Sequence, residues 1–234
     1  MSSAPGCINA RCDNIAPAAL PGRTHRVVAI GAARDTQQEP DKPIMAAFQS
    51  QPFRISQAVK VLAGGGVVAC PTEAVWGLSC DPFNEAAVQH LLELKSRPVE
   101  KGLILVAADM DQLRWLTRGL EKAQRSRLEL SWPGATTWLV PHGGLVPPWV
   151  SGSFDTVALR VSAHPTVVQL CRAFGGPLVS TSANPASAPP ALEQFQLRRY
   201  FGDALDAIVP GVLGGNRRPS TIKDLATDRV IRAG

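Results

Sequence analysis

The chain has 234 residues, of which 45% are hydrophobic and 18% charged, and its formal net charge is +5. This length suits one domain with or without a tail, and the hydrophobic fraction excludes a wholly disordered chain. No window approaches the ~18 uninterrupted apolar residues of a membrane-spanning helix, so we expect no membrane contact. The 20 glycines and 20 prolines favour a loop-rich α/β or β architecture. The positive charge favours anionic partners.

The cysteines and histidines show no metal-binding pattern. The five cysteines form no CxxC pair, and the four histidines are dispersed along the chain. A zinc site needs its ligands at short, regular spacings. We therefore expect no metal site in the protein itself, and a reduced, cytoplasmic protein.

Residues 1–44 differ in composition from the rest of the chain. They hold five prolines and nearly balanced charges, with no sustained apolar period. Such a segment has little apolar surface to bury on folding. We predict a disordered N-terminal extension over residues 1–44 and a single folded, catalytic domain over residues 45–234.

Deletion of residues 1–44 tests this division. We expect the thermal midpoint and the activity to stay almost unchanged, because every motif described below lies after residue 44. Residues 27–30 are the one stretch of the extension with strand character. A midpoint lowered by more than about 5 °C, roughly 1–2 kcal/mol for a domain of this size, would show that the extension is structural.

Helices and strands alternate in the first half of the domain. Ile55, Val59 and Leu62 share one helical face, and glycines 64–66 end that helix. Asn84 is a suitable N-cap for a helix that runs through Lys95. The other elements predicted before residue 142 are strands at 67–70, 103–107 and 136–141 and helices at 109–116 and 121–130.

The second half continues the alternation without an internal repeat. Pro165 opens a helix that Gly175 and Gly176 end, which is the usual arrangement of these residues. The remaining predicted elements are strands at 157–161, 178–181, 206–209, 219–223 and 229–232 and a helix at 191–201. This pattern predicts an α/β fold with one twisted, mixed sheet and flanking helices.

Common catalytic and nucleotide-binding motifs are absent from the sequence. No GxxxxGK[ST] loop occurs, and no GxGxxG follows a predicted strand. GxSxG, HExxH and the deaminase zinc signature are missing as well. A nucleotide, if one is bound, must be held by a different scheme.

Polar or cationic side chains follow predicted strand or helix ends in four segments, 71–78, 95–102, 180–184 and 217–221. The first segment offers a hydroxyl and a carboxylate where open sheets usually bind ligands. The second and the fourth carry Lys and Arg, which suit carboxylate or phosphate groups. These segments favour a site for an anionic small molecule such as a triphosphate.

Ordinary structural roles would also explain these residues. Thr72 and Glu73 can satisfy backbone groups in a turn, and Lys95 and Arg97 can neutralise a helix C-terminus. Arg160 is different, because it interrupts an apolar strand and a buried arginine needs an anionic partner.

Six motifs, in order across about residues 50–234, resemble those of the YrdC/Sua5 family. They are Pro71-Thr72-Glu73 with Trp76-Gly77-Leu78, Leu94-Lys95-Ser96-Arg97-Pro98, Trp132-Pro133-Gly134, Ala158-Leu159-Arg160-Val161 with His164-Pro165, Ser180-Thr181-Ser182-Ala183-Asn184, and Pro219-Ser220-Thr221-Ile222. One motif would be weak evidence, but six in order are specific. The resemblance implies the YrdC-like fold, with a concave, positively charged cavity.

Members of that family condense L-threonine, bicarbonate or carbon dioxide, and ATP into L-threonylcarbamoyladenylate and release pyrophosphate. A separate complex transfers the threonylcarbamoyl group to adenosine 37 of tRNAs that read codons starting with A, which gives t6A. The resemblance therefore implies ATP with Mg²⁺, L-threonine and bicarbonate as partners of this chain. Direct contact with tRNA or with the transferase complex is left open.

The resemblance also implies site residues. The family's KxR…SxN signature matches Lys95, Arg97, Ser182 and Asn184, and it implies catalytic roles for Lys95 and Arg97 as partly exposed cations. The implied threonine-binding residues are Thr72, Arg160 and Ser182, with the substrate carboxylate as the anion that Arg160 needs. The implied ATP-binding residues are Lys95, Arg97, Thr136 or Thr137, Ser180, Asn184, Arg218 (or Arg217) and Ser220.

The sequence departs from the family pattern at one place, and two other functions are alternatives to the synthase activity that the resemblance implies. The family usually continues Ser-Ala-Asn with Leu-Ser-Gly, whereas this chain has Pro185-Ala186-Ser187. An RNA-binding module of the same fold would also need a basic concave surface, although such modules usually carry aromatic platforms. A carbamoyl-transfer enzyme of hydrogenase maturation has a similar central domain but adds acylphosphatase and zinc-finger modules.

Overall fold

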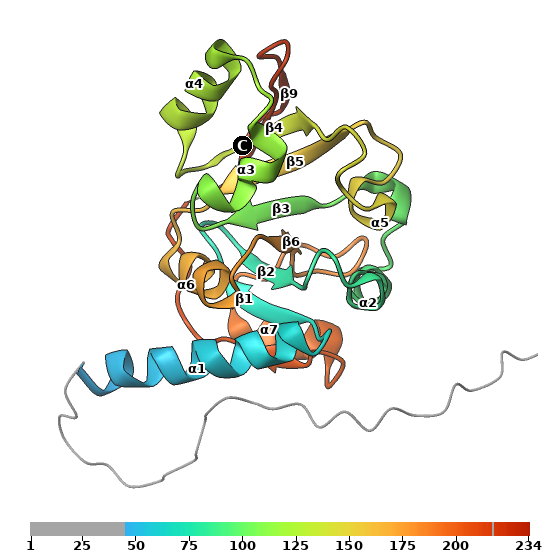
Figure 1. Ribbon diagram of the computed structural model, residues 1–234. Helices are drawn as coiled ribbons and strands as arrows, with labels where there is room; N and C mark the ends of the chain where they lie inside the picture. Colours follow the sequence, from blue (N-terminus) through green and yellow to red (C-terminus); the bar gives the residue numbers. More distant parts are fainter. Residues whose placement is uncertain (1–44, 217) are drawn as a thin grey trace, which may run out of the picture.

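The computed structural model describes residues 45–216 and 218–234 (Figure 1). The prediction for residues 1–44 lies outside the described residues, as does Arg217. The helices are α1 Met45–Ala63, α2 Glu85–Lys95, α3 Arg114–Thr117, α4 Lys122–Ser131, α5 Pro148–Ser151, α6 Pro165–Phe174 and α7 Gln194–Phe201, with short 3-10 turns at Val99–Lys101 and Asp111–Leu113. None of the described helices is long and apolar enough to cross a membrane.

The strands form one sheet in the order β7-β1-β2-β6-β3-β5-β4-β8-β9. Their bounds are β1 Val68–Pro71, β2 Trp76–Ser79, β3 Ile104–Ala107, β4 Thr136–Pro141, β5 Thr156–Val161, β6 Leu178–Ser182, β7 Ala207–Ile208, β8 Thr221–Asp224 and β9 Val230–Arg232. Three neighbouring pairs are parallel (β1–β7, β3–β5 and β4–β8), and the other five are antiparallel. The predicted mixed α/β sheet is therefore confirmed.

The residues predicted to begin and end helices α2 and α6 do so in the structure. The Asn84 side chain accepts a hydrogen bond from the Ala87 backbone N–H at 3.1 Å, which satisfies a free donor at the start of α2. Pro165 begins α6, and Gly175 ends it with a φ of 87°. These boundaries depend on neighbouring residues alone.

Several elements differ from the prediction, and the helix expected at 191–201 begins three residues later, at Gln194. β2 was not predicted, because Trp76–Ser79 is short, contains a glycine and forms a strand through pairing with β1 and β6 on its two sides. The helix expected at 109–116 is a 3-10 turn followed by the single turn α3. The strand expected at 219–223 begins two residues later, at Thr221.

Two hydrophobic clusters lie on opposite faces of the sheet. Along β5, Val157, Leu159 and Val161 belong to the larger cluster, which also takes in side chains from α2, α3, α4, α5 and α7. The smaller cluster packs α1 and α6 against β1 and β7, and Figure 1 shows these two helices next to β1. The alternate β5 residues, Ala158 and Arg160, point to the face of the smaller cluster and are only partly buried. There, α1 and α6 do not cover the sheet, and the sheet forms the floor of a cavity.

Candidate active site

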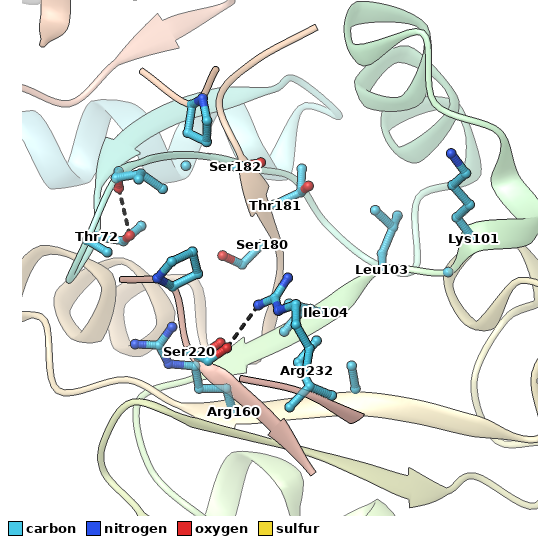
Figure 2. Close-up of a pocket in the computed structure, with 18 of the residues that line it drawn as sticks. Thr72, Lys101, Leu103, Ile104, Arg160, Ser180, Thr181, Ser182, Ser220 and Arg232 are labelled. Atoms are coloured by element: carbon cyan, nitrogen blue, oxygen red, sulfur yellow. Dashed lines mark hydrogen bonds between the residues drawn. The ribbon is translucent and has the colours of Figure 1, made fainter. Parts of the chain in front are cut away.

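A cavity of about 550 Å³ lies over the part of the sheet that α1 and α6 leave uncovered. Ser180, Ile104, Ala158 and Leu139 form a row across its floor, because each is paired in register with the next on neighbouring strands β6, β3, β5 and β4. Figure 2 shows Ser180 and its neighbours on one side of the cavity, with Arg160 and Arg232 on another. The floor is therefore largely apolar, and polar groups surround it.

The predicted basic character of this cavity is present. Five cationic side chains are among the described residues that line it, and Glu73 is the single acidic one. The five are Arg97, Lys101, Arg160, Arg218 and Arg232. Fixed cations around a partly closed space are suited to substrates with several negative charges.

Arg160 has an anionic partner within the protein. Its Nη2 lies 2.7 Å from Glu73 Oε1, and its Nε donates to the Gly134 carbonyl at 3.0 Å. The anionic partner that the sequence analysis requires for Arg160 is thus Glu73 of the same chain, whereas the expectation named a substrate carboxylate. Arg160 nevertheless lines the cavity, as the sequence predicts.

Glu73 connects two segments that are distant in sequence. Its Oε1 also accepts hydrogen bonds from Ser162 Oγ at 2.7 Å and from the Ala163 N–H at 3.1 Å. Burial alone would raise the pKa of Glu73, but the charge of Arg160 and these hydrogen bonds outweigh it, so the pKa lies below its usual value. Glu73 is consequently an anion at neutral pH.

Lys95 is a buried structural cation, which corrects the expectation of partial exposure. It is 5% exposed and does not line the cavity. Its Nζ donates to the Ser182 carbonyl, to the Asn184 carbonyl at 2.7 Å and to Asn184 Oδ1 at 3.4 Å. Burial, with a further contribution from the charge of Arg97, lowers the pKa of Lys95 to about 8. Lys95 thus holds the loop that follows β6.

The loop after β6 is ordered by its own polar groups. Ser182 Oγ donates to Asn184 Oδ1 at 2.6 Å, and Asn184 Nδ2 donates to the Ala188 carbonyl at 2.7 Å. Ser187 has a φ of 69°, at the position where the family pattern has glycine. Ser187 thus adopts the left-handed conformation that glycine takes most readily. Ser182 lines the cavity, whereas Asn184 does not.

Arg97 extends from the end of α2 to the cavity and is half-buried. Its Nη2 donates to the Gly102 carbonyl at 2.9 Å and to the Lys101 carbonyl at 3.3 Å. Its Nε is buried and has no hydrogen-bond partner in the described chain. Burial lowers the pKa of Arg97, but an arginine remains charged. Of the two predicted catalytic cations, Arg97 is thus the one that faces the cavity.

Of the other predicted substrate-binding residues, some line the cavity and others do not. Thr72, Ser180, Arg218 and Ser220 line the cavity. Thr137 is fully buried, with its hydroxyl 2.8 Å from Ser220 Oγ, and neither Thr136 nor Thr137 lines the cavity. Thr72 Oγ1 donates to the Val75 carbonyl at 2.7 Å, so the turn explanation holds for this hydroxyl in the structure.

Three charged lining residues, Glu73, Lys101 and Arg232, were not among the predicted site residues. Glu73 and Lys101 lie inside motifs that the sequence analysis singled out. Arg232 carried no local signal, because the β8–β9 hairpin places it, with its Nη2 donating to the Ser220 carbonyl at 2.9 Å. Figure 2 shows Arg232 near Ser220.

Similarity to known proteins agrees with this geometry. The family model described as "Telomere recombination" (Sua5/YciO/YrdC) matches residues 60–234. Proteins named threonylcarbamoyl-AMP synthase are similar over most of their length: that of Cellvibrio japonicus is 54% identical over 76% of this chain and 95% of its own. The Pseudomonas aeruginosa protein is 56% identical over 77% and 97%.

A solved structure of a more distant protein is also similar. P. abyssi Sua5 complexed with L-threonine has a TM-score of 0.70 and 30% identity, over 74% of this chain and 51% of that protein. The present chain therefore spans about half of the length of P. abyssi Sua5.

Proposed function

Because this chain belongs to the Sua5/YciO/YrdC family, we propose that it is an enzyme that condenses L-threonine, bicarbonate and ATP. The products are L-threonylcarbamoyladenylate, pyrophosphate and water. The observation that carries this proposal is the cavity, which joins an apolar floor to five cations and one carboxylate. An adenine base suits the floor, while a triphosphate and an amino acid suit the charged groups.

The protein groups act by positioning and by charge stabilisation. The threonine amine attacks carbon dioxide or activated bicarbonate, and the resulting carbamate oxygen attacks the α-phosphorus of ATP, which displaces pyrophosphate. Arg97, Arg218 and Arg232 surround the space in which charge would accumulate on the phosphates. Lys95 would act indirectly, because its ammonium group donates to the Ser182 carbonyl and so holds the end of β6 that lines the cavity.

Mg²⁺ belongs to the proposal as the ion that accompanies ATP. Residues 45–216 and 218–234 contain no cluster of three metal-ligating side chains, and the cavity offers one carboxylate. This donor set fits an ion that keeps several waters and is bound mainly by phosphate oxygens. When bound, Mg²⁺ would neutralise charge on the triphosphate.

The product would serve t6A formation on tRNA, and a cytoplasmic location is a further part of the proposal. Contact with tRNA or with the transferase complex is a further part of the proposal. Relatives more than half identical to this chain carry the synthase name, which favours an enzyme over an RNA-binding module.

Pyrophosphate release by the purified chain tests the proposed function. We expect release that requires ATP, L-threonine and bicarbonate together, and an adduct with the mass of threonylcarbamoyladenylate. Omission of each substrate in turn is the control. Release that ignores threonine, or tight tRNA binding without turnover, would contradict the synthase assignment and favour the RNA-binding alternative.

A further inference from the structure

The segment that connects β7 with β8 spans the sheet, because β7 lies at one edge and β8 is next to the strand at the other edge. Residues 209–216 form its first part, the strap. Asn216 lines the cavity, and so do Arg218 and Ser220, which follow the strap along the chain. The position of the strap therefore affects where these cavity residues lie.

Backbone contacts hold one side of the strap. The Gly214 N–H donates to the Thr72 carbonyl at 3.0 Å, and the Asn216 N–H donates to the Glu73 carbonyl at 2.9 Å. A Cβ added at Gly214 would lie 2.9 Å from Glu73 Cα and 3.2 Å from His164 Cδ2. The strap thus fits closely against the segment after β1 and against His164.

His164 holds the strap through its side chain. Its Nε2 lies 3.1 Å from the Val212 carbonyl oxygen, and no other described side chain is hydrogen-bonded to the strap backbone. Burial lowers the pKa of His164, so the ring is neutral at neutral pH. A carbonyl only accepts, so the single ring proton is on Nε2, while Nδ1 is buried without a partner among the described residues. His164 is 4% exposed and does not line the cavity.

Little else in the strap fixes its shape. Three of its residues, at 211, 214 and 215, are glycines, and Val212 is 84% exposed. A glycine-rich segment loses much conformational freedom when it is ordered. A strap released from His164 would have to be ordered whenever a ligand binds Arg218, and that cost weakens binding.

We propose that His164 is a positioning residue for ATP, which holds the strap at Val212 so that Arg218 faces the triphosphate. This inference rests on the proposed function, and it adds a residue outside the cavity to those that determine ATP affinity.

ATP binding by the full chain tests this role. Titration with ATP and Mg²⁺, without threonine and bicarbonate, measures affinity apart from turnover. His164→Leu should weaken ATP binding about five- to tenfold, as the loss of one hydrogen bond implies. His164→Gln, whose amide nitrogen lies as many bonds from the backbone as Nε2 does, should bind ATP within about twofold of the wild type. Unchanged affinity in His164→Leu, or equal weakening in both variants, overturns the proposal.

Val167→Ala separates positioning from stability. Val167 is buried in the smaller hydrophobic cluster, on the helix that His164 precedes, so its truncation should lower the thermal midpoint. Its ATP affinity should stay within about twofold of the wild type, and a loss equal to that of His164→Leu overturns the proposal. If His164→Leu does not fold, Gly214→Ala, which displaces the strap, should weaken ATP binding instead, and wild-type affinity in that variant overturns the proposal.

A double-mutant cycle tests the path through Arg218. In an Arg218→Ala background, His164→Leu should weaken ATP binding by less than about twofold, because the contact that it positions is gone. Losses that multiply overturn the proposal. Failure of the proposed function would look different: no pyrophosphate release from the wild type, with ATP binding that still depends on His164.

Discussion

Lys95→Met should lower pyrophosphate release by about 100-fold or more and should also lower the thermal midpoint. The ammonium group of Lys95 satisfies the partly buried Ser182 and Asn184 carbonyls, and an acceptor left without a partner away from water costs about 1–3 kcal/mol. For a chain of this size that cost corresponds to roughly 3–10 °C. The loss of activity follows because a loop displaced by about 1 Å can cost two orders of magnitude in rate.

Calorimetry and the pyrophosphate assay would measure the two effects on the same samples. Lys122→Met is the matched control, since Lys122 is exposed and lies outside the cavity, and its loss should change the midpoint by less than about 2 °C. An unchanged midpoint in Lys95→Met would show that the loop does not depend on the buried ammonium group. Retained activity would contradict any role for Lys95 in arranging Ser182.

Arg97→Ala should lower kcat/KM for ATP by about 10- to 150-fold, with a smaller change in stability than Lys95→Met causes. The guanidinium lines the cavity, and a charge-assisted contact to a phosphate oxygen contributes about 1.5–3 kcal/mol. Part of the side chain is buried, so solvent screens this contact less than it would a surface pair.

Steady-state kinetics with ATP varied at saturating threonine and bicarbonate would measure this effect. Arg114→Ala is the matched control, because Arg114 is exposed, lies outside the cavity and forms a surface ion pair with Asp111 at 3.4 Å. We expect its kcat/KM to stay within a factor of two. Full activity in Arg97→Ala would remove Arg97 from the site, and an equal loss in Arg114→Ala would point to a nonspecific effect of net charge.

Several features of the site follow from short stretches of sequence. The Asn84 cap and the αL Gly175 act through backbone groups within a few residues, so the ends of α2 and α6 are predictable. The motifs place Thr72, Ser180 and Ser182 at or near strand ends, where the sheet opens to the cavity. The alternation of β5 likewise turns Arg160 away from the larger core, because side chains alternate between the faces of a strand.

By itself, then, the sequence determined the mixed α/β fold, the family and seven of the residues that line the cavity. Only the tertiary structure decided what each charged group contacts. Lys95 meets Ser182 and Arg160 meets Glu73 across separations of 87 residues each, and Arg232 reaches the cavity through the β8–β9 hairpin. Burial and ion pairing depend on the packing of distant segments, which local periodicity and spacing do not encode. For this reason the motifs alone did not show that Lys95 is buried and holds the loop after β6, or that Glu73 lines the cavity.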